Sequence, residues 1–246
     1  MTVTRQDFED AIAAYWGAKR TQREMSVIKD AVGAGTAGDV RGGKHFDEIA
    51  ALLAKFFLEA GYAPGDIRVT SGLELPGYYR PQKKWDVVVA HRNTLVAAFE
   101  LKALGGPSFG NNYNNRVEEA LGSAVDLRRA ALADLFPGER PWLGYFFIMQ
   151  DAKGSRSPVR TAKGVFPVED TWKDASYQRR FSIFCERLMA EGLYDAVCYI
   201  TSSAEDPTPV ELVESLDWKH FAAAITARIT YLKELGLPEP RDALPL

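Results

Sequence analysis

An apolar stretch at residues 85–102, WDVVVAHRNTLVAAFELK, constrains the fold of this chain most strongly. Its apolar residues occupy consecutive rather than alternate positions, which is typical of strands that are covered on both faces of a sheet. The pattern predicts one strand over 85–90, a turn over 91–94 and a second strand over 95–101, paired as a hairpin. A chain built around such a hairpin needs helices on both sides of its sheet.

Three charged residues stand at the ends of these apolar strands. If the hairpin folds about Asn93, Asp86 lies opposite Glu100, and Lys102 falls on the same face because it follows Glu100 by two residues. Two neighbouring carboxylates repel each other and are costly to bury, and a bound divalent cation offsets both the repulsion and the cost of burial. An Asp followed by Glu-x-Lys on the next strand suits phosphodiester hydrolysis. The carboxylates, helped by the Leu101 carbonyl, would hold Mg²⁺, and the lysine would orient or activate a water molecule.

The acid-x-lysine pattern is short, so a structural ion pair remains an alternative to a metal site. The pattern occurs twice more, at Asp151-Ala152-Lys153 and at Asp217-Trp218-Lys219. The last precedes a helical pattern and predicts an N-cap, and the other has no opposed carboxylate upstream. Glu48 could be a further acid of the site, although an acid favoured by the dipole of a helix's first turn is the preferred interpretation.

Composition and charge exclude several classes of protein. A net charge of −3 and a pI near 5.7 argue against indiscriminate nucleic-acid binding, although Lys and Arg gather around the hairpin. No apolar run is long enough to cross a membrane, and the N-terminus carries acids where a signal peptide would be basic and then apolar, so we expect a cytoplasmic protein. Cys185 and Cys198 fit buried reduced thiols, and neither they nor the three histidines have metal-ligand spacing, which argues against a zinc site.

The rest of the chain predicts an α/β core with a mixed central β-sheet flanked by helices. Helices are expected over 5–22, 44–60, 116–135, 176–191 and 217–235, and further strands over 67–71, 143–149 and 196–201. Loops are expected over 25–43, 72–84, 105–116 and, as a polar excursion, 150–168. We expect one endonuclease-like domain over 1–246, with an N-terminal helical segment and a C-terminal helix around a core at roughly 44–201.

Two segments beside the hairpin carry candidate DNA contacts. Arg80, Lys83 and Lys84 enter the hairpin just upstream of Asp86, where they are either contacts to the DNA backbone or solvated surface charge. Residues 111–115 hold more asparagines than a helix cap requires, and Asn and Arg are the favoured partners of adenine and guanine. The candidate contacts there are Asn111, Asn112, Asn114, Asn115 and Arg116.

Four runs of the sequence resemble the XhoI family of Type II restriction endonucleases. They are ELPGYYRPQKKWDVVV, AAFELKALGGPSFGNNYNNRVEEALGSAVDL, RPWLGYFFIM and LYDAVCYITSS, and the likeness extends over most of the chain. The resemblance implies the PD-(D/E)xK restriction-endonuclease-like fold, with Asp86 and Glu100 as signature acids and Lys102 as the signature lysine. Trp85 departs from the general motif, which has a proline there.

The same resemblance carries expectations about the reaction and its partners. It implies Mg²⁺-dependent cleavage of double-stranded DNA at the palindrome CTCGAG, leaving 5′-phosphates, by a homodimer whose twofold axis matches that of the site. It also implies a DNA methyltransferase as a genetic partner, without physical association. Two alternatives stay open: a structure-specific or repair nuclease on the same core, and a DNA-binding or assembly module in which the three charges form a buried ion cluster.

Overall fold

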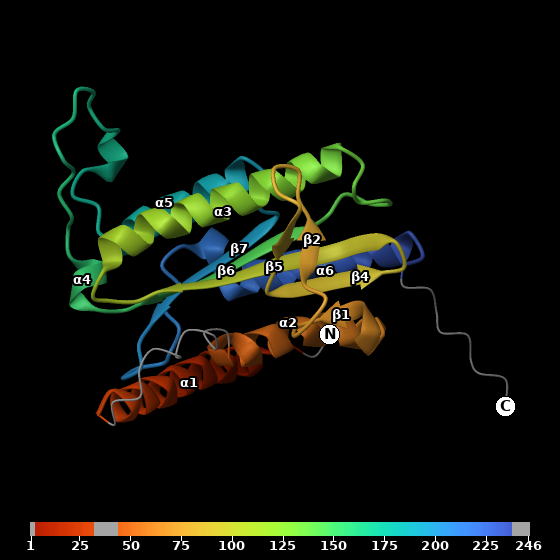
Figure 1. Ribbon diagram of the computed structural model, residues 1–246, viewed down its shortest axis with the longest axis horizontal. Helices are drawn as coiled ribbons and strands as arrows, with labels where there is room; N and C mark the ends of the chain where they lie inside the picture. Colours follow the sequence, from red (N-terminus) through yellow and green to blue (C-terminus); the bar gives the residue numbers. More distant parts are fainter. Residues whose placement is uncertain (1–2, 32–43, 238–246) are drawn as a thin grey trace.

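A five-stranded mixed sheet forms the centre of the computed structural model, which describes residues 3–31 and 44–237 (Figure 1). The strands lie in the order β1-β4-β5-β6-β7; β1, β4 and β5 pair antiparallel, and β5, β6 and β7 pair parallel. Their bounds are β1 Ile67–Arg68, β4 Val87–His91, β5 Thr94–Leu104, β6 Leu143–Gln150 and β7 Ala196–Ser202. The predicted α/β class with a mixed central sheet is therefore confirmed.

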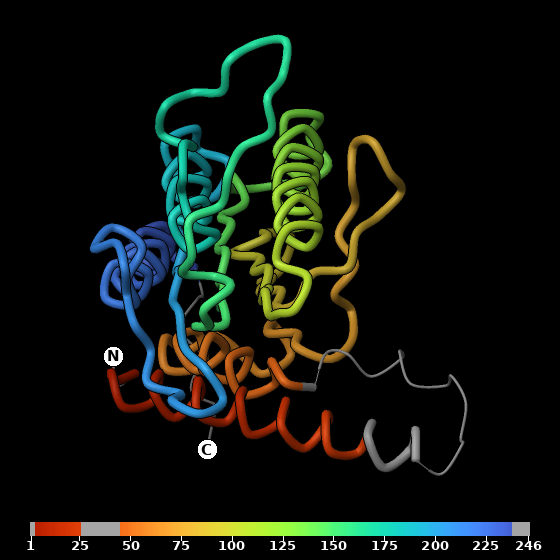
Figure 2. The backbone as a smooth tube through the Cα atoms, turned by 90° about the vertical axis from the view of Figure 1, so that its left-hand side faces the viewer, coloured from red at the N-terminus to blue at the C-terminus, as the bar shows by residue number. Residues whose placement is uncertain are grey.

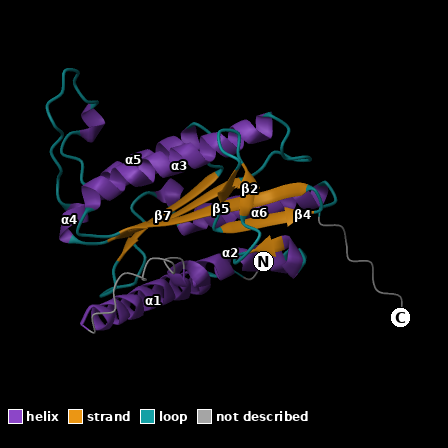
Figure 3. Ribbon diagram, viewed as in Figure 1, coloured by secondary structure: helices purple, strands orange, loops and turns teal. Residues whose placement is uncertain are grey.

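Helices cover both faces of this sheet (Figure 3). Helices α1, α2 and α6 pack on one face, and α3 and α5 pack on the other. The chain crosses from β5 to β6 and then from β6 to β7, moving in the same direction across the sheet each time. Because crossovers between parallel strands are right-handed, α3 and α5 lie on the same face. The α-helices are α1 Arg5–Ala31, α2 Asp47–Glu59, α3 Phe109–Leu132, α4 Lys153–Arg156, α5 Tyr177–Ala190 and α6 Trp218–Glu234, and short 3₁₀ turns lie at Lys44–Phe46, Pro64–Asp66, Asp170–Trp172 and Glu214–Leu216. None of the helices in the described ranges is long and apolar enough to span a bilayer.

The central hairpin has the register that the sequence predicts. Val87 pairs with Phe99 and Val89 with Ala97, and an irregularity beyond Val89 shifts the pairing by one residue before a tight turn at Arg92 and Asn93. The turn is tighter than the predicted one because Arg92 adopts a positive φ of 52°. Strand β5 continues to Leu104, three residues beyond the prediction, because its parallel ladder with β6 continues that far.

A small second sheet corrects the prediction of a loop over 72–84. Strands β2 (Glu74–Pro76) and β3 (Gln82–Lys84) pair antiparallel, and their hairpin stands beside α3 (Figure 2). The buried Asp126 carboxylate on α3 accepts hydrogen bonds from the backbone N–H groups of Tyr78 and Tyr79, at 2.8 and 2.7 Å. This support comes from a segment some 50 residues away, so the local sequence does not reveal it.

Helix α3 begins at Phe109, so the prediction of a loop over 105–116 is wrong from residue 109 onward. Phe109 is buried and stacks on Tyr177, and Tyr113 packs edge-on against Phe181. These rings extend the apolar stripe of the helix by two turns, and tertiary packing overrides the low helix propensity of the asparagines between them. The asparagines therefore lie on a helix and not in a loop.

The N-terminal helix is also longer than predicted. Helix α1 continues past residue 22 to Ala31, so residues 25–31 of the predicted loop are helical, while residues 32–43 lie outside the described residues. The predicted strand over 67–71 is reduced to Ile67–Arg68. The two helix starts at Ser176 and Asp217 are confirmed, since each side chain accepts a hydrogen bond from a backbone N–H of its helix's first turn.

Candidate active site

Asp86, Glu100 and Lys102 converge as the hairpin register predicts. The Nζ atom of Lys102 lies 3.1 Å from Glu100 Oε1 and 3.3 Å from Asp86 Oδ2. Asp86 precedes β4, and its Oδ2 atom also accepts the backbone N–H of Leu101 at 2.8 Å, which fixes the carboxylate against β5. One ammonium group therefore bridges two carboxylates from neighbouring segments of the sheet.

Glu100 is charged although it is almost fully buried. Its exposed fraction is 2 %, and burial by itself raises the pKa of the carboxyl group. The ammonium groups of Lys102 and Lys83, together with hydrogen bonds from Lys102 and Tyr194, outweigh that influence and lower the pKa below its ordinary value. Burial likewise opposes the charge on Lys102, but Glu100 and Asp86 raise the pKa of that amine. Both groups are thus ionised at neutral pH.

Lys83 belongs to this site and not to the solvated surface. Its side chain is only 14 % exposed, its Nζ atom lies 3.4 Å from Glu100 Oε1, and it sits 4.3 Å above the centre of the Trp85 ring. Burial lowers the pKa of Lys83, and the Glu100 carboxylate opposes that shift. The indole of Trp85, where the general motif has a proline, thus packs against a second lysine of the site.

Tyr194 is a site residue that the sequence does not identify. It lies in the turn before β7, is fully buried, and its hydroxyl is 3.1 Å from Glu100 Oε2 and 3.3 Å from the Ala120 carbonyl oxygen. The two lysines contact Oε1 of Glu100, whereas Tyr194 donates to Oε2. A tyrosine almost one hundred residues from its partner gives no local signal, because only the parallel sheet brings the two together.

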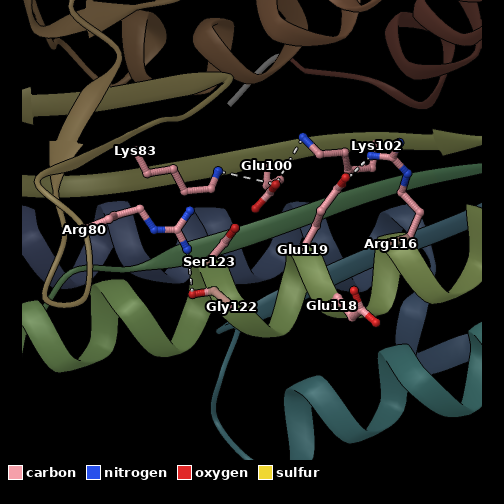
Figure 4. Close-up of a pocket in the computed structure, with 9 residues that line it drawn as sticks. All are labelled: Arg80, Lys83, Glu100, Lys102, Arg116, Glu118, Glu119, Gly122 and Ser123. Carbon is pink, nitrogen blue, oxygen red and sulfur yellow. Dashed lines mark hydrogen bonds and ion pairs between the residues drawn. The ribbon is translucent and has the colours of Figure 1, made fainter.

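A cleft of about 580 Å³ opens over Lys83, Glu100 and Lys102, between β5 and α3, and Asp86 lies outside its lining (Figure 4). Lys83 and Lys102 flank Glu100 on the sheet side, and α3 supplies the opposite wall. The residues that line the cleft are Arg80, Lys83, Glu100, Lys102, Arg116, Glu118, Glu119, Gly122 and Ser123. Three of the predicted DNA contacts therefore lie in the same cleft as two of the predicted catalytic residues.

The remaining predicted DNA contacts have different surroundings. Lys84 is exposed on β3, where it follows Lys83 and so points to the opposite face of the strand. Asn111, Asn114 and Asn115 are exposed on the first turns of α3, and Asn112 is half-buried there. Within the cleft, Arg80 pairs with Asp126 at 2.8 Å, and Arg116 pairs with Glu119. These guanidinium groups are held by acidic partners on α3.

The oxygen atoms around Lys102 fit a divalent cation. The Nζ atom lies within 3.4 Å of three oxygens, those of Asp86, Glu100 and the Leu101 carbonyl, which are oxygen ligands of the kind that Mg²⁺ binds. Over residues 3–31 and 44–237, no cluster of three or more acidic, histidine or cysteine side chains forms a metal site. Mg²⁺ is compatible with so few protein ligands, since it retains several water molecules and binds through one or two carboxylates.

The other acid-x-lysine sequences take structural positions. Asp217 caps α6 by accepting the backbone N–H of His220 at 2.7 Å, as predicted. Asp151 accepts hydrogen bonds from Arg156 and Gln178 at the end of β6. Glu48 is exposed in the first turn of α2, a position that the helix dipole favours for an acid.

The half-buried His45 lies close enough to Asp86 for the two side chains to interact electrostatically. His45 packs against the rings of Tyr15 and Phe46, and burial together with the nearby Lys19 lowers its pKa from 6.5 to about 4, while Asp86 opposes the shift. The imidazole is therefore neutral at pH 7. The sequence contains no spacing that assigns His45 to this position.

Comparisons with known proteins give consistent matches. The family model described as restriction endonuclease XhoI matches residues 26–212. The chain is 40 % identical to the Type II restriction enzyme BstVI of Geobacillus stearothermophilus over 70 % of this chain and 79 % of that protein. It is 36 % identical to the Type II restriction enzyme XhoI of Xanthomonas vasicola over 74 % and 73 % of the two chains, and 36 % identical to AbrI of Azospirillum brasilense over 63 % and 72 %. No solved structure matches the chain.

Proposed function

Because this chain belongs to the XhoI family of Type II restriction endonucleases, we propose that it cuts double-stranded DNA at the site formed by Asp86, Glu100 and Lys102. The observation that carries the assignment is the convergence of three oxygens on the Lys102 ammonium within 3.4 Å. Asp86, Glu100 and the Leu101 carbonyl would hold Mg²⁺. When bound, the metal neutralises charge on the scissile phosphate and lowers the pKa of a coordinated water.

The side chains of the site have separable tasks in this proposal. In the metal-free protein Glu100 and Asp86 raise the pKa of Lys102 against the opposing influence of burial, so its ammonium group is a hydrogen-bond donor that would orient water or a phosphate oxygen. Lys83 holds the second charge beside Glu100, and Tyr194 fixes the far oxygen of that carboxylate. Arg80 and Arg116 offer positive charge at the two ends of the cleft for DNA phosphates or bases.

Membership of the family supports a proposal for the substrate and the assembly. We propose the palindrome CTCGAG as the site, 5′-phosphate ends as the product, and a homodimer as the active form, because a palindrome presents two identical half-sites. Asn111, Asn114 and Asn115 would contribute base or phosphate contacts from the exposed side of α3, together with Asn112 and Lys84. A cognate DNA methyltransferase would be a genetic partner only. A cytoplasmic location and one endonuclease domain over 1–246 remain predictions.

A plasmid with a single CTCGAG tests this assignment. The wild-type protein should linearise it with Mg²⁺ and leave it uncut in chelator. Asp86→Ala, Glu100→Ala and Lys102→Ala should abolish cutting, whereas Lys219→Ala, in another acid-x-lysine sequence, should cut normally. Cutting at many unrelated positions would favour a structure-specific or repair nuclease instead. A folded Glu100→Ala protein that cuts at the wild-type rate would end the proposal.

One observation favours a second candidate, a non-catalytic DNA-binding module. Lys83 and Lys102 neutralise the two carboxylates without a metal, as a structural ion cluster would. The two candidates differ in their response to Mg²⁺, because only a metal site gains stability by mass action. Mg²⁺ should raise the melting temperature of the wild-type protein and leave that of Asp86→Ala unchanged; an identical response in both, without cleavage, would select the second candidate.

A further inference from the structure

A strongly basic segment protrudes from the α3 and α5 side of the molecule, and the site described above does not include it. We define the basic arm as residues 153–168, which contain four cations and no acid in a chain of net charge −3. Lys153, Arg156, Arg160 and Lys163 are all exposed. Figures 1 and 2 show the arm extending beyond the ends of α3 and α5. Such a local excess of positive charge attracts a polyanion.

The base of the arm is fixed to the core. Ser155 is fully buried, and its hydroxyl donates to the Gln150 carbonyl oxygen at 2.8 Å. Gln178 on α5 donates to both Asp151 and Ser155, at 2.9 and 3.2 Å. Farther along, Arg180 donates to the carbonyl oxygen of Val159 at 2.8 Å. These bonds fix the base of the arm as far as Val159 to the core, which reduces the entropy that this part loses when a ligand binds.

The tip of the arm exposes large apolar side chains. Val165 is 95 % exposed and Phe166 is 83 % exposed, close in the chain to Lys163. Cations next to an exposed aromatic ring suit a nucleic acid, because phosphates take the charges while sugars and base edges offer apolar surface.

The arm is continuous with the wall of the catalytic cleft. Gly154, in the arm, lies so close to the ring of Phe109 at the start of α3 that an added Cβ would be only 3.1 Å from it. The same helix carries the exposed asparagines in its first turns and Arg116 in the cleft. A duplex seated in the cleft and running along the start of α3 would meet the arm next.

We infer that the basic arm grips the DNA duplex beside the cut site, with its cations on backbone phosphates and Phe166 against the sugars or base edges of a groove. This inference rests on the proposed function. A second copy of the chain is the competing occupant. The charge disfavours it, since a twofold axis passing through this segment would bring two segments of four positive charges together.

The test compares two variants with matched changes in net charge. Arg160→Gln with Lys163→Gln removes two arm cations that make no ion pair with another described side chain, and Lys219→Gln with Lys233→Gln removes two exposed cations from α6 on the opposite face. Binding to a labelled CTCGAG duplex is measured by fluorescence anisotropy, with Ca²⁺ in place of Mg²⁺ so that binding is separated from cutting. Melting curves check that both variants fold.

The salt dependence distinguishes a phosphate contact from a general charge effect. Each lost phosphate contact reduces the magnitude of the slope of log affinity against log salt by about 0.9. The arm variant loses two cations, so the magnitude of its slope should be smaller than that of the wild type by about 1.8. Between about 50 and about 200 mM salt, the affinity advantage of the wild type over this variant should therefore shrink by about 12-fold. The α6 variant should keep the wild-type slope. Phe166→Ser should weaken binding without changing the slope.

The outcomes separate this inference from the proposed function. A wild type that binds and cuts, beside an arm variant with an unchanged salt slope, overturns the inference and leaves the proposed function standing. An unchanged slope with a loss of dimer in sedimentation assigns the arm to a contact between copies, which also overturns it. A wild type that binds no duplex under any of these conditions overturns both.

Discussion

Replacing Tyr194 by Phe removes one oxygen atom from the buried surroundings of Glu100. The Tyr194 hydroxyl donates to Glu100 Oε2 at 3.1 Å, and both lysines contact the other carboxylate oxygen, so neither replaces the lost bond from its present position. A hydrogen bond to a charged group contributes about 1.5–3 kcal/mol. We therefore expect Tyr194→Phe to lower the free energy of unfolding of the metal-free protein at pH 7 by about 2 kcal/mol.

Urea denaturation in chelator measures this change, with Tyr199→Phe as the matched control. The Tyr199 hydroxyl is buried on the same face and donates to a neutral acceptor, the carbonyl oxygen of Gln178, at 3.1 Å. Its loss should lower the free energy of unfolding by about 1 kcal/mol. In a Glu100→Gln background, Tyr194→Phe should also cost less than in the wild type, because the charge on the acceptor is gone.

The effect of Tyr194→Phe should also depend on pH with a defined sign. The pKa of Glu100 is lowered in the folded protein, so its stabilising contribution is present above the ordinary pKa and is lost as the pH falls through the lowered value. The stability difference between wild type and Tyr194→Phe should therefore narrow in acid. Equal losses in the Tyr194 and Tyr199 variants at pH 7, with no narrowing in acid, would refute a charge-assisted bond to Glu100.

Two further predictions concern the surroundings of the site. The lowered pKa of His45, about 4 against 6.5, means that the folded protein resists a proton that the unfolded chain accepts, so the free energy of unfolding should fall as the pH drops through that window. Because His45 is partly exposed, the loss should be at most about 3 kcal/mol; His45→Gln should flatten this slope in urea titrations at several pH values, and an unchanged slope would contradict the assignment. Asp126→Ala removes the acceptor for the N–H groups of Tyr78 and Tyr79 and the partner of Arg80, and should destabilise the protein by about 2–3 kcal/mol. It should also speed chymotryptic cleavage at these tyrosines, and cleavage at the wild-type rate would show that the hairpin stands without this anchor.

The central hairpin shows how far sequence reasoning reaches at the site. The run of apolar residues predicts two strands buried on both faces, and the counting of residues about Asn93 brings Asp86, Glu100 and Lys102 together, as the contacts bear out. This works because residues paired in a short hairpin are close in the chain, so that local pattern and register determine which side chains meet. The catalytic roles of the three residues remain a proposal.

Two of the predictions that were wrong concern packing between distant segments. Phe109 and Tyr113 start α3 two turns early because they pack against α5, and the hairpin over Glu74–Lys84 forms on the Asp126 carboxylate. The contacts of Lys83 and Tyr194 with Glu100 also join distant segments, and the sequence did not predict them. In each case a partner between about 17 and 94 residues away supplies the contact.

By itself, the sequence determined the mixed α/β core, the hairpin and the three charges that it brings to one point, because all of these follow from periodicity and short-range pairing. Only the tertiary structure decided which oxygen of Glu100 each neighbour contacts, that Lys83 faces inward, and that a basic arm stands next to the start of α3. The physical reason is that a parallel sheet joins strands through long crossovers, and the contacts across it depend on packing that no local pattern encodes.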